Sequence, residues 1–331
     1  MIHKKKIKGL GLCSGGLDSI LAALILREQG IEVLWIAFET PFFPADKARK
    51  ASINNKIPII VKNITERYMS MLRNPKCGYG KNMNPCMDCH ALMFRIAGEM
   101  MEETKSDFLF SGEVMGQRPM SQNKNSLRYV EKNSGYDGYI LRPLSAKVLP
   151  ETPMELNGLV DREKLCGFSG RSRKPQMELA RKFGVVDYPA PAGGCLLTDG
   201  GYAKRLKDLF DHQDNVEVSE MDLLSYGRHL RLDKDVKVVI GRNKKDNGNI
   251  LRYYRPDKDI LIEVKDIPGP VTLIPNGCDD DAVVRAASIT AGYSKAVKDE
   301  PVVVCVTQSD GRKEITVTPI PNFEIQNFLI P

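Results

Sequence analysis

Hydrophobic residues in the first part of the chain form short continuous runs that alternate with segments of helical spacing. The runs are typical of buried strands, and the segment SILAALILREQG has helical spacing that ends at Gly30. This alternation predicts an α/β fold with a parallel sheet covered on both faces. The expected strands lie at 7–13, 33–40, 57–64 and 107–113, and a further helix is expected over 91–106.

The following segments are less regular. Residues 116–139 are polar and predict a loop, whereas 173–186 have the composition of a helix that ends near Gly184. Residues 188–201 are dense in proline and glycine, which indicates an ordered loop at the end of a first domain.

After about residue 205 the pattern changes to β-rich segments with one helix among them. This change predicts a second, smaller α+β domain. We therefore expect domains at 1–204 and 205–331. The β-rich segments lie at 229–242, 259–275, 301–308 and 313–319, and the helix lies at 281–295.

Composition narrows the class of protein. The 331 residues are 42% hydrophobic and 27% charged, as in ordinary globular proteins, and no apolar run reaches the roughly 20 residues that a membrane helix needs. The first residues lack the pattern of a signal peptide, so we expect a cytoplasmic protein without membrane contact. Its eight cysteines should then be reduced, and close pairs among them indicate metal or catalytic sites.

Charge is distributed unevenly. Residues 1–204 carry 30 basic and 21 acidic groups, a net of +9, and residues 205–331 carry 18 and 21, a net of −3. The first domain therefore attracts anions more strongly.

Directly after the first predicted strand stands Ser14-Gly15-Gly16-Leu17-Asp18-Ser19, which opens a helix. Two glycines allow a tight turn whose N–H groups face an anion, and the helix N-terminus adds its positive dipole end. An ordinary strand–helix turn capped by Ser14 or Asp18 is the simpler alternative. The position at the end of the first strand, where α/β sheets bind ligands, favours a pyrophosphate site.

The sequence SGGLDS resembles the signature of the PP-loop ATP pyrophosphatases, a family related to the adenine nucleotide alpha hydrolases. The resemblance implies that Ser14, Gly15, Gly16 and Ser19 hold the phosphates of ATP and that Asp18 positions Mg²⁺. It places the adenine near Phe38 to Thr40. Ser111-Gly112-Glu113 is similar to the Thr-Gly-His that completes the nucleotide site in related enzymes, with Glu113 in place of histidine.

Cys86, Cys89 and Cys195 stand in segments that can converge at one edge of this sheet, the first two before the predicted helix from Ala91. Asn84-Pro85-Cys86-x-x-Cys89 and the segment ELAR before Cys195 are similar to the tRNA 2-thiouridine synthases of the same superfamily. Three cysteines can hold three irons of a 4Fe–4S cluster and leave the fourth iron open for hydrosulfide.

Two other chemistries remain open at these thiols. Two cysteines can act as a persulfide carrier and its disulfide partner, which leaves Cys86 without a task. Zinc can bind three cysteines together with His90. Of the two sulfur-transfer chemistries, the cluster is the one that gives every thiol a task.

Other polar residues near these motifs are candidates for substrate contact. Basic groups at 171–174 can clamp phosphate or RNA, or can be a solvated helix start, and Gln117 and Arg118 can touch nucleotide or substrate.

The second domain resembles the NFACT-R type of RNA-binding domain, on Gly241-Arg242-Asn243 and the residues up to Asn247 after a strand. The alternative is an ordinary hairpin with solvated charges at its turn. The resemblance implies RNA contacts by a local basic patch, which we expect to contain Arg228, His229, Arg231, Arg242, Lys244 and Lys245.

Together these features predict an ATP-dependent tRNA uridine sulfurtransferase that receives sulfide directly or from a donor protein. The catalytic residues are then Asp18, Cys86, Cys89 and Cys195. The alternatives are sulfur insertion or amide transfer on a small molecule, and an RNA-binding protein that only senses nucleotide.

Overall fold

The computed structural model describes residues 6–190 and 195–330, and the chain divides into two units between Leu196 and Leu197. The expected boundary after residue 204 falls inside helix α9 (Gly200–His212), which belongs to the second unit. Of the loop expected at 188–201, residues 191–194 lie outside the described part of the chain.

Unit 1 contains a parallel five-stranded sheet in the order β3-β2-β1-β4-β5. The central strand β1 therefore pairs with β2 on one side and with β4 on the other. The predicted α/β fold is confirmed. The strands are β1 (Lys8–Leu12), β2 (Glu32–Glu39), β3 (Ile59–Asn63), β4 (Phe108–Ser111) and β5 (Ile140–Leu141).

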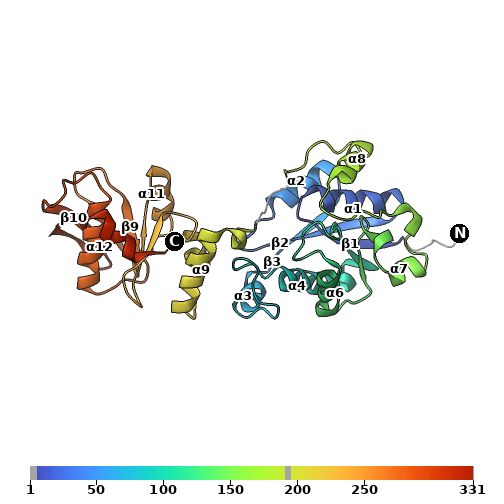
Figure 1. Ribbon diagram of the computed structural model, residues 1–331, viewed down its shortest axis with the longest axis horizontal. Helices are drawn as coiled ribbons and strands as arrows, with labels where there is room; N and C mark the ends of the chain where they lie inside the picture. Colours follow the sequence, from blue (N-terminus) through green and yellow to red (C-terminus); the bar gives the residue numbers. More distant parts are fainter. Residues whose placement is uncertain (1–5, 191–194, 331) are drawn as a thin grey trace. The chain divides into compact units, whose positions relative to one another are not determined.

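Helices cover both faces of this sheet, with α1, α2 and α8 on one side and α3, α4 and α6 on the other (Figure 1). The helices of unit 1 are α1 (Leu17–Glu28), α2 (Asp46–Asn55), α3 (Thr65–Arg73), α4 (Cys86–Glu99), α5 (Met101–Thr104), α6 (Lys124–Ser134), α7 (Pro153–Leu156) and α8 (Lys174–Lys182). Short 3₁₀ turns lie at Ala146–Val148, Arg162–Lys164 and Leu196–Thr198.

The expected strands become the core because their side chains are buried on both faces of the sheet. Leu10, Trp35, Phe108 and Phe110 are each 0% exposed. Gly11 is required beside Phe110, since a Cβ atom at Gly11 would lie 2.1 Å from the Phe110 ring. Gly11 and Phe110 are register partners, and the parallel pairing of β1 with β4 brings the ends of these strands together.

The polar loop expected at 116–139 contains a helix instead. Helix α6 begins after Asn123, whose side chain caps the backbone N–H of Ser126, and ends at Gly135 in the left-handed conformation. The segment was predicted as a loop because few of its residues are hydrophobic. It forms a helix because Leu127 and Val130, three positions apart, are both buried on one side of it.

Unit 2 contains an antiparallel seven-stranded sheet in the order β11-β10-β8-β9-β7-β6-β12. Its strands are β6 (Arg228–Arg231), β7 (Lys237–Ile240), β8 (Ile260–Val264), β9 (Val271–Ile274), β10 (Val302–Gln308), β11 (Gly311–Val317) and β12 (Leu329–Ile330). Its helices are α9, α10 (Val218–Leu223), α11 (Lys244–Leu251), α12 (Asp280–Gly292) and α13 (Asn322–Ile325), with a 3₁₀ turn at Gln326–Phe328.

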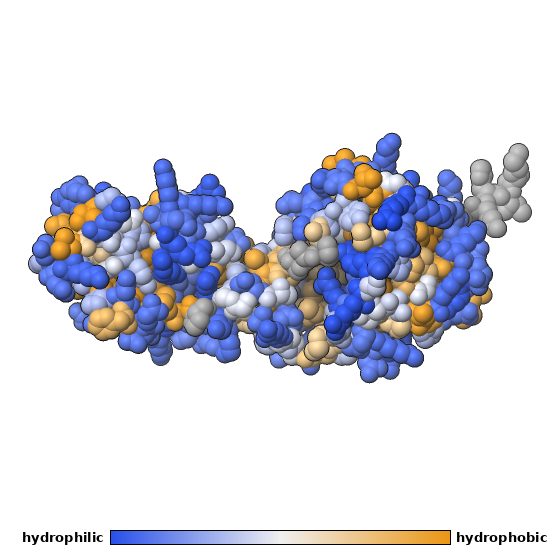
Figure 2. All heavy atoms as spheres, turned by 45° about the horizontal axis from the view of Figure 1, so that its top comes forward, coloured by the Kyte–Doolittle hydropathy of each residue, from blue (hydrophilic) through white to orange (hydrophobic). Residues whose placement is uncertain are grey.

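Each unit has its own hydrophobic core, and in unit 2 the buried face of α12 packs against the sheet. On the face drawn in Figure 2, hydrophobic residues lie in small separate patches among hydrophilic ones. Among the helices of the described residues, none is both long enough and apolar enough to cross a bilayer.

Candidate functional site

The phosphate loop lies where the strand order of the parallel sheet reverses. Strands β2 and β3 follow β1 to one side, and β4 and β5 lie on the other, so the ends of β1 and β4 flank the switch point of the sheet. Ligands of open α/β sheets bind at such a point. Ser14, Gly15 and Gly16 follow β1, and Ser111 ends β4.

Glycine is required at two positions here. Gly15 has φ 73°, and a Cβ atom there would lie 2.3 Å from the backbone carbon of Lys47, at the start of α2. A Cβ atom at Gly112 would lie 2.3 Å from the backbone carbon of Asp18. The first turn of α1 is therefore enclosed by backbone from two other segments.

Side chains of the loop support its turn. Ser19 is 6% exposed, and its hydroxyl donates to the carbonyl oxygen of Gly16 at 2.8 Å. Ser14 is exposed, and its Oγ accepts from the backbone N–H of Gly16 at 3.4 Å. Phe38 is 7% exposed near the end of β2, just before a bridge between Thr40 and Phe43.

Cys86 and Cys89 lie within the first turn of α4, and not before the helix as we expected. The helix begins directly after Pro85, whose carbonyl oxygen accepts from the backbone N–H of Cys89 at 2.8 Å. The expectation was wrong because the apolar pattern begins only at Ala91, whereas the first turn is stabilised by polar contacts. Asp88 is 6% exposed and accepts the N–H of Cys77 at 2.8 Å.

The third thiol reaches this turn from the end of unit 1. The N–H of Leu196, next to Cys195, donates to the carbonyl oxygen of Phe42 at 3.1 Å, and the ring of Phe42 lies 5.6 Å from that of Tyr68. Burial raises the pKa of Cys89, and the neighbouring Cys195 raises it further.

Tyr68 completes the surroundings of the thiols. It is 1% exposed, and its pKa is raised by burial first and then by Cys89 and Cys195. Cys86 lies near the thiol of Cys89, and its own sulfur accepts a hydrogen bond from the Asn84 amide at 3.3 Å. The three predicted thiols are therefore neighbours around one buried tyrosine, which the sequence analysis did not identify.

Within the described ranges, no set of three His, Cys, Asp or Glu side chains is arranged to hold a metal ion. A cubane cluster makes a different demand, because its cysteines bind separate irons and do not converge on one point. Three neighbouring thiols match that donor set.

Glu113 connects the end of β4 with the thiol turn. Its Oε1 lies 2.8 Å from Nδ1 of His90, and its Oε2 accepts from Arg142 Nε at 2.9 Å. Burial alone would raise the pKa of Glu113, but the charge of Arg142 and the hydrogen bond from His90 lower it to about 2. The ionised carboxylate can only accept, so Nδ1–H of His90 donates this hydrogen bond. Arg142 is 2% exposed, and the sequence analysis did not identify it. Its position directly after an apolar strand was the only sign in the sequence that it is buried.

Asp18 accepts a hydrogen bond from Gln117 at 2.8 Å, so one of the two suggested residues of the segment Gln117–Arg118 reaches the phosphate loop. The phosphate loop, the end of β4 and the thiol turn are thus linked by direct contacts. All of them lie at the C-terminal edge of the sheet of unit 1.

In unit 2 the predicted basic residues have different surroundings. Lys244 and Lys245 are exposed at the start of α11, and Arg242 is exposed but pairs with Asp246 at 2.5 Å. The Arg228 guanidinium lies 4.7 Å from the centre of the Tyr293 ring. Among the predicted RNA-binding residues, Lys244 and Lys245 therefore have exposed side chains, whereas Arg242 is paired with an acidic neighbour.

Two members of the expected patch are instead turned into the fold. Arg231 pairs with Asp208 of α9 at 2.7 Å. His229 is 1% exposed, and burial, with Lys237 nearby, lowers its pKa well below the usual value. Arg231 therefore links β6 to α9, and His229 is part of the buried interior of unit 2.

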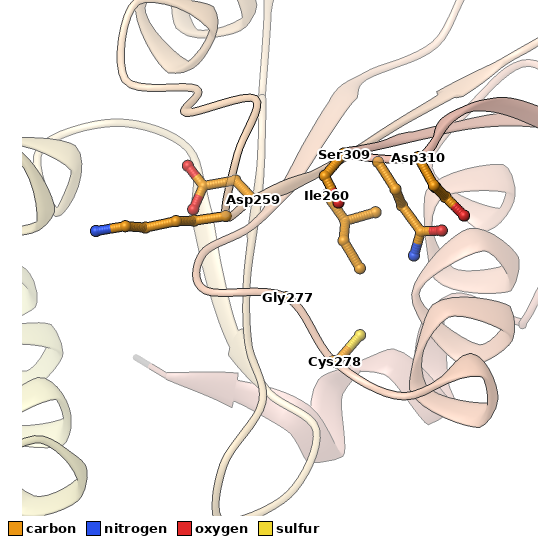
Figure 3. Close-up of a pocket in the computed structure, with 8 residues that line it drawn as sticks. Asp259, Ile260, Gly277, Cys278, Ser309 and Asp310 are labelled. Carbon is orange, nitrogen blue, oxygen red and sulfur yellow. The ribbon is translucent and has the colours of Figure 1, made fainter.

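Unit 2 also has a surface hollow of about 320 Å³ (Figure 3), between the start of β8, the loop before α12 and the turn after β10. Two of its ionisable side chains are already paired, Asp259 with Arg255 and Lys258 with Glu217. Burial and Asp279 raise the pKa of Cys278 to about 11, so its thiol is protonated.

Comparison with known protein families gives separate matches for the two units. Residues 5–147 match the model of the thiamine biosynthesis protein ThiI, and residues 227–329 match that of the NFACT protein RNA binding domain. Over these residues the chain is similar to ThiI and to the NFACT RNA binding domain, and the two matches lie in different units. The family resemblances expected from SGGLDS and from the segment after Gly241 are confirmed.

Two curated relatives illustrate the similarity of the PP-loop domain. The tRNA-specific 2-thiouridylase MnmA of Karelsulcia muelleri is 27% identical over 198 residues, which are 56% of this chain and 48% of the relative. A probable tRNA sulfurtransferase of Ureaplasma urealyticum is 30% identical over 148 residues, 41% of this chain and 36% of the relative. The chain thus spans about half the length of these relatives or less.

Similarity to solved structures is weaker. NMN synthetase from Francisella tularensis has a TM-score of 0.34 and 13% identity, over 66% of this chain and 83% of that protein.

Proposed function

We propose that the protein is an ATP-dependent tRNA uridine sulfurtransferase. The observation that carries the proposal is the joining of two groups at one sheet edge: the phosphate loop before α1 and three neighbouring thiols around Tyr68. ATP activation and sulfur delivery need such proximity, because the activated uridine must meet the sulfur nucleophile before water reaches it.

The reaction has two steps. The uridine carbonyl oxygen attacks the α-phosphorus of ATP and displaces pyrophosphate. Sulfide then attacks the ring carbon that carries the adenylated oxygen. The bond between this carbon and the oxygen breaks, and AMP leaves. Adenylation is needed because the oxygen of a carbonyl group is a poor leaving group, whereas AMP departs readily.

The phosphate loop binds and orients the nucleotide in this proposal. The backbone amides of Gly15 and Gly16 face the phosphates, and the N-terminus of α1 stabilises the negative charge that develops during displacement. Asp18 fits a magnesium ligand because its Oδ1 is buried and has no hydrogen-bond partner. Phe38 and the residues up to Thr40 are the proposed contacts of the adenine, and Ser111 and Gly112 close the site from β4.

Cys86, Cys89 and Cys195 are the proposed ligands of a 4Fe–4S cluster. When bound, such a cluster would have one iron without a protein ligand and would supply a binding place for hydrosulfide there. The thiols must lose their protons to bind iron, and the raised pKa of Cys89 means that cluster binding releases a proton from that residue.

Unit 2 is proposed to hold the tRNA. The NFACT-R match and the exposed Lys244 and Lys245 support this assignment, since exposed lysines provide the phosphate contacts that dominate affinity for nucleic acids. Arg228 and Arg242 can add contacts at the rim of the same patch.

Purification without oxygen provides the direct test. We expect the wild-type protein to be coloured and to contain iron, and we expect Cys86→Ala, Cys89→Ala and Cys195→Ala each to lose iron. With tRNA, sulfide and MgATP, the wild type should release AMP and pyrophosphate in equal amounts and form a thiolated nucleoside that mass spectrometry detects. A colourless, iron-free wild type that still thiolates tRNA would contradict the cluster and favour the persulfide pair or zinc.

The other functions give different results in the same assay. Thiolation or amide transfer on a small molecule would proceed without tRNA. A nucleotide sensor would bind ATP and tRNA but release neither AMP nor pyrophosphate.

A further inference from the structure

The residues that open α8 approach the start of α1 in unit 1. Arg173 directly precedes α8, and its Nη2 lies 3.8 Å from Asp18 Oδ1. Both Asp18 Oδ1 and Arg173 Nε are buried, and neither has a hydrogen-bond partner. Because a buried polar atom without a hydrogen bond is unfavourable, an acceptor and a donor left open in one ion pair indicate a place for a polar ligand.

A pair of glutamine amides fixes the other side of Asp18. Gln117 Nε2 donates to Asp18 Oδ2 at 2.8 Å, and Gln117 Oε1 accepts from Gln176 Nε2 at 3.0 Å. Gln176 lies in α8, is 0% exposed, and its Oε1 has no partner. One oxygen of Asp18 is thus held in place through α8, and the other stays open.

From this arrangement we infer that α8 is part of the nucleotide site. Arg173 is a ligand of the β- and γ-phosphates, and Gln117 and Gln176 are positioning residues that aim Asp18 Oδ1 at the magnesium ion. This inference deepens the proposed function and rests on it. A guanidinium matches phosphate oxygens with two parallel hydrogen bonds, and a carboxylate oxygen suits Mg²⁺.

The ion pair between Arg173 and Asp18 is then the contact of the nucleotide-free protein. Without nucleotide, the guanidinium balances the charge of Asp18. When the magnesium–triphosphate complex binds, the cation replaces Arg173 at Asp18 and the guanidinium turns to the phosphates. Nucleotide binding therefore changes the contact between α1 and α8, two helices that pack together on one face of the sheet.

Calorimetric titration of the full chain tests this inference, with MgATP, magnesium pyrophosphate and AMP as separate probes. Arg173→Gln should weaken binding of MgATP and of magnesium pyrophosphate by roughly tenfold or more, since one charge-assisted contact is lost. AMP binding should change less than about twofold, because AMP lacks the β- and γ-phosphates. Arg173→Lys should give an intermediate loss, because it keeps the charge without the planar fork.

The matched control is Arg181→Gln, an exposed arginine of the same helix, which should leave all three affinities unchanged. Thermal unfolding without ligand verifies that the variants are folded. An equal loss for AMP and MgATP, or no loss for MgATP, would overturn the role of Arg173.

Two further arms separate related explanations. An RNA backbone offers the same phosphate chemistry, so tRNA is titrated without nucleotide; weaker tRNA binding by Arg173→Gln with unchanged MgATP binding would contradict the inference. Gln117→Leu tests positioning. It should raise several-fold the Mg²⁺ concentration at which ATP binding is half-maximal, with metal-free ATP binding unchanged, and an unaltered Mg²⁺ requirement counts against positioning by the amide pair.

Failure of the inference and failure of the proposed function look different. If the wild type binds MgATP and Arg173→Gln binds it equally well, only the inference fails. If the wild type binds neither MgATP nor magnesium pyrophosphate, both fail. If Arg173→Gln loses MgATP binding but the wild type does not thiolate tRNA, the inference stands and the proposed reaction is wrong.

Discussion

The two units use charged side chains in different ways. In unit 1, the Asp18–Arg173 pair leaves an acceptor and a donor open at the switch point of the sheet. In unit 2, Asp208 of α9 is fully engaged, with Arg231 at 2.7 Å and Lys237 at 3.1 Å. The difference lies in the two aspartates: Asp18 Oδ1 has no hydrogen-bond partner, whereas both oxygens of Asp208 accept hydrogen bonds. We therefore propose a ligand at Asp18 and a structural role for Asp208.

Removal of Asp208 should give the largest effect. Asp208→Asn leaves Arg231 and the 5% exposed Lys237 without their counter-charge, and breaking such a buried pair costs about 3–5 kcal/mol. We expect hydrogen exchange, followed by mass spectrometry, to accelerate in β6 and β7 and to change little in unit 1.

Asp211→Asn on the same helix is the control, because Asp211 pairs with Lys207 at the surface and about half of its side chain is exposed. Its effect should stay below about 1 kcal/mol. Similar effects of the two substitutions would mean that the network around Asp208 is not structural.

Gly112→Ala should destabilise unit 1 by an amount comparable to the effect of Asp208→Asn in unit 2, with the change confined to the start of α1. The Cβ atom of Gly112→Ala meets the Asp18 backbone at 2.3 Å, and overpacking of this kind costs about 3 kcal/mol at the upper end of its range. Because the first turn of α1 must move, MgATP binding measured by calorimetry should be lost together with stability.

Gly248→Ala in α11 provides the comparison, since nothing lies within 4 Å of its Cβ position. Alanine is the better helix former by about 0.5–1 kcal/mol, so this variant should be slightly more stable and bind MgATP normally. Normal MgATP binding by Gly112→Ala would show that the close approach to α1 does not form the site.

Stability in unit 2 should depend on pH through Lys237. Burial lowers its pKa to about 8 despite the charge of Asp208, whereas an unfolded lysine has a pKa near 10.5. Between these values the unfolded chain binds one more proton than the folded chain, so the free energy of unfolding rises with pH, by at most about 1.4 kcal/mol per unit. Below pH 8 both states carry the proton and this contribution is flat.

The measurement is urea unfolding of the wild type and of Lys237→Met between pH 7.5 and 10.5. The wild type should gain stability relative to the variant as pH rises through this window. A constant difference would mean that Lys237 stays protonated in the folded state.

The exposed lysines of unit 2 should give the smallest effect. Lys244→Ala and Lys245→Ala should each weaken tRNA binding a few-fold and reduce the slope of affinity against salt by about 1, as expected for phosphate contacts. Neither should change thermal stability, in contrast to Arg231→Ala. Unchanged tRNA affinity would move the RNA-binding surface away from α11.

The sequence predicts best where burial is continuous. Strands β1 and β2 are largely buried on both faces, so their existence and the parallel sheet could be predicted from hydrophobic runs alone. Helix α6 was missed because only a narrow stripe of it is buried. The thiols Cys86 and Cys89 were identified by their spacing, but their place inside the first turn of α4 depends on Pro85 and Asp88.

Contacts between distant residues were the least predictable part of the site. Asp18, Gln117 and Gln176 are joined by two hydrogen bonds although they come from three separate segments. No local pattern encodes this chain of amides. The same is true of Glu113, whose departure from the family histidine became meaningful only when His90 and Arg142 were found beside it.

The separation of Cys195 from the other thiols has a consequence for biosynthesis. Cys195 follows Cys89 by more than a hundred residues, so at roughly 5–20 residues per second the ribosome delivers it about 5–20 seconds later. A cluster that needs all three cysteines can be completed only after the last segment of unit 1 has docked beside Phe42. During that interval Cys86 and Cys89 are already synthesised, so the proposed cluster would be assembled only after unit 1 has been translated.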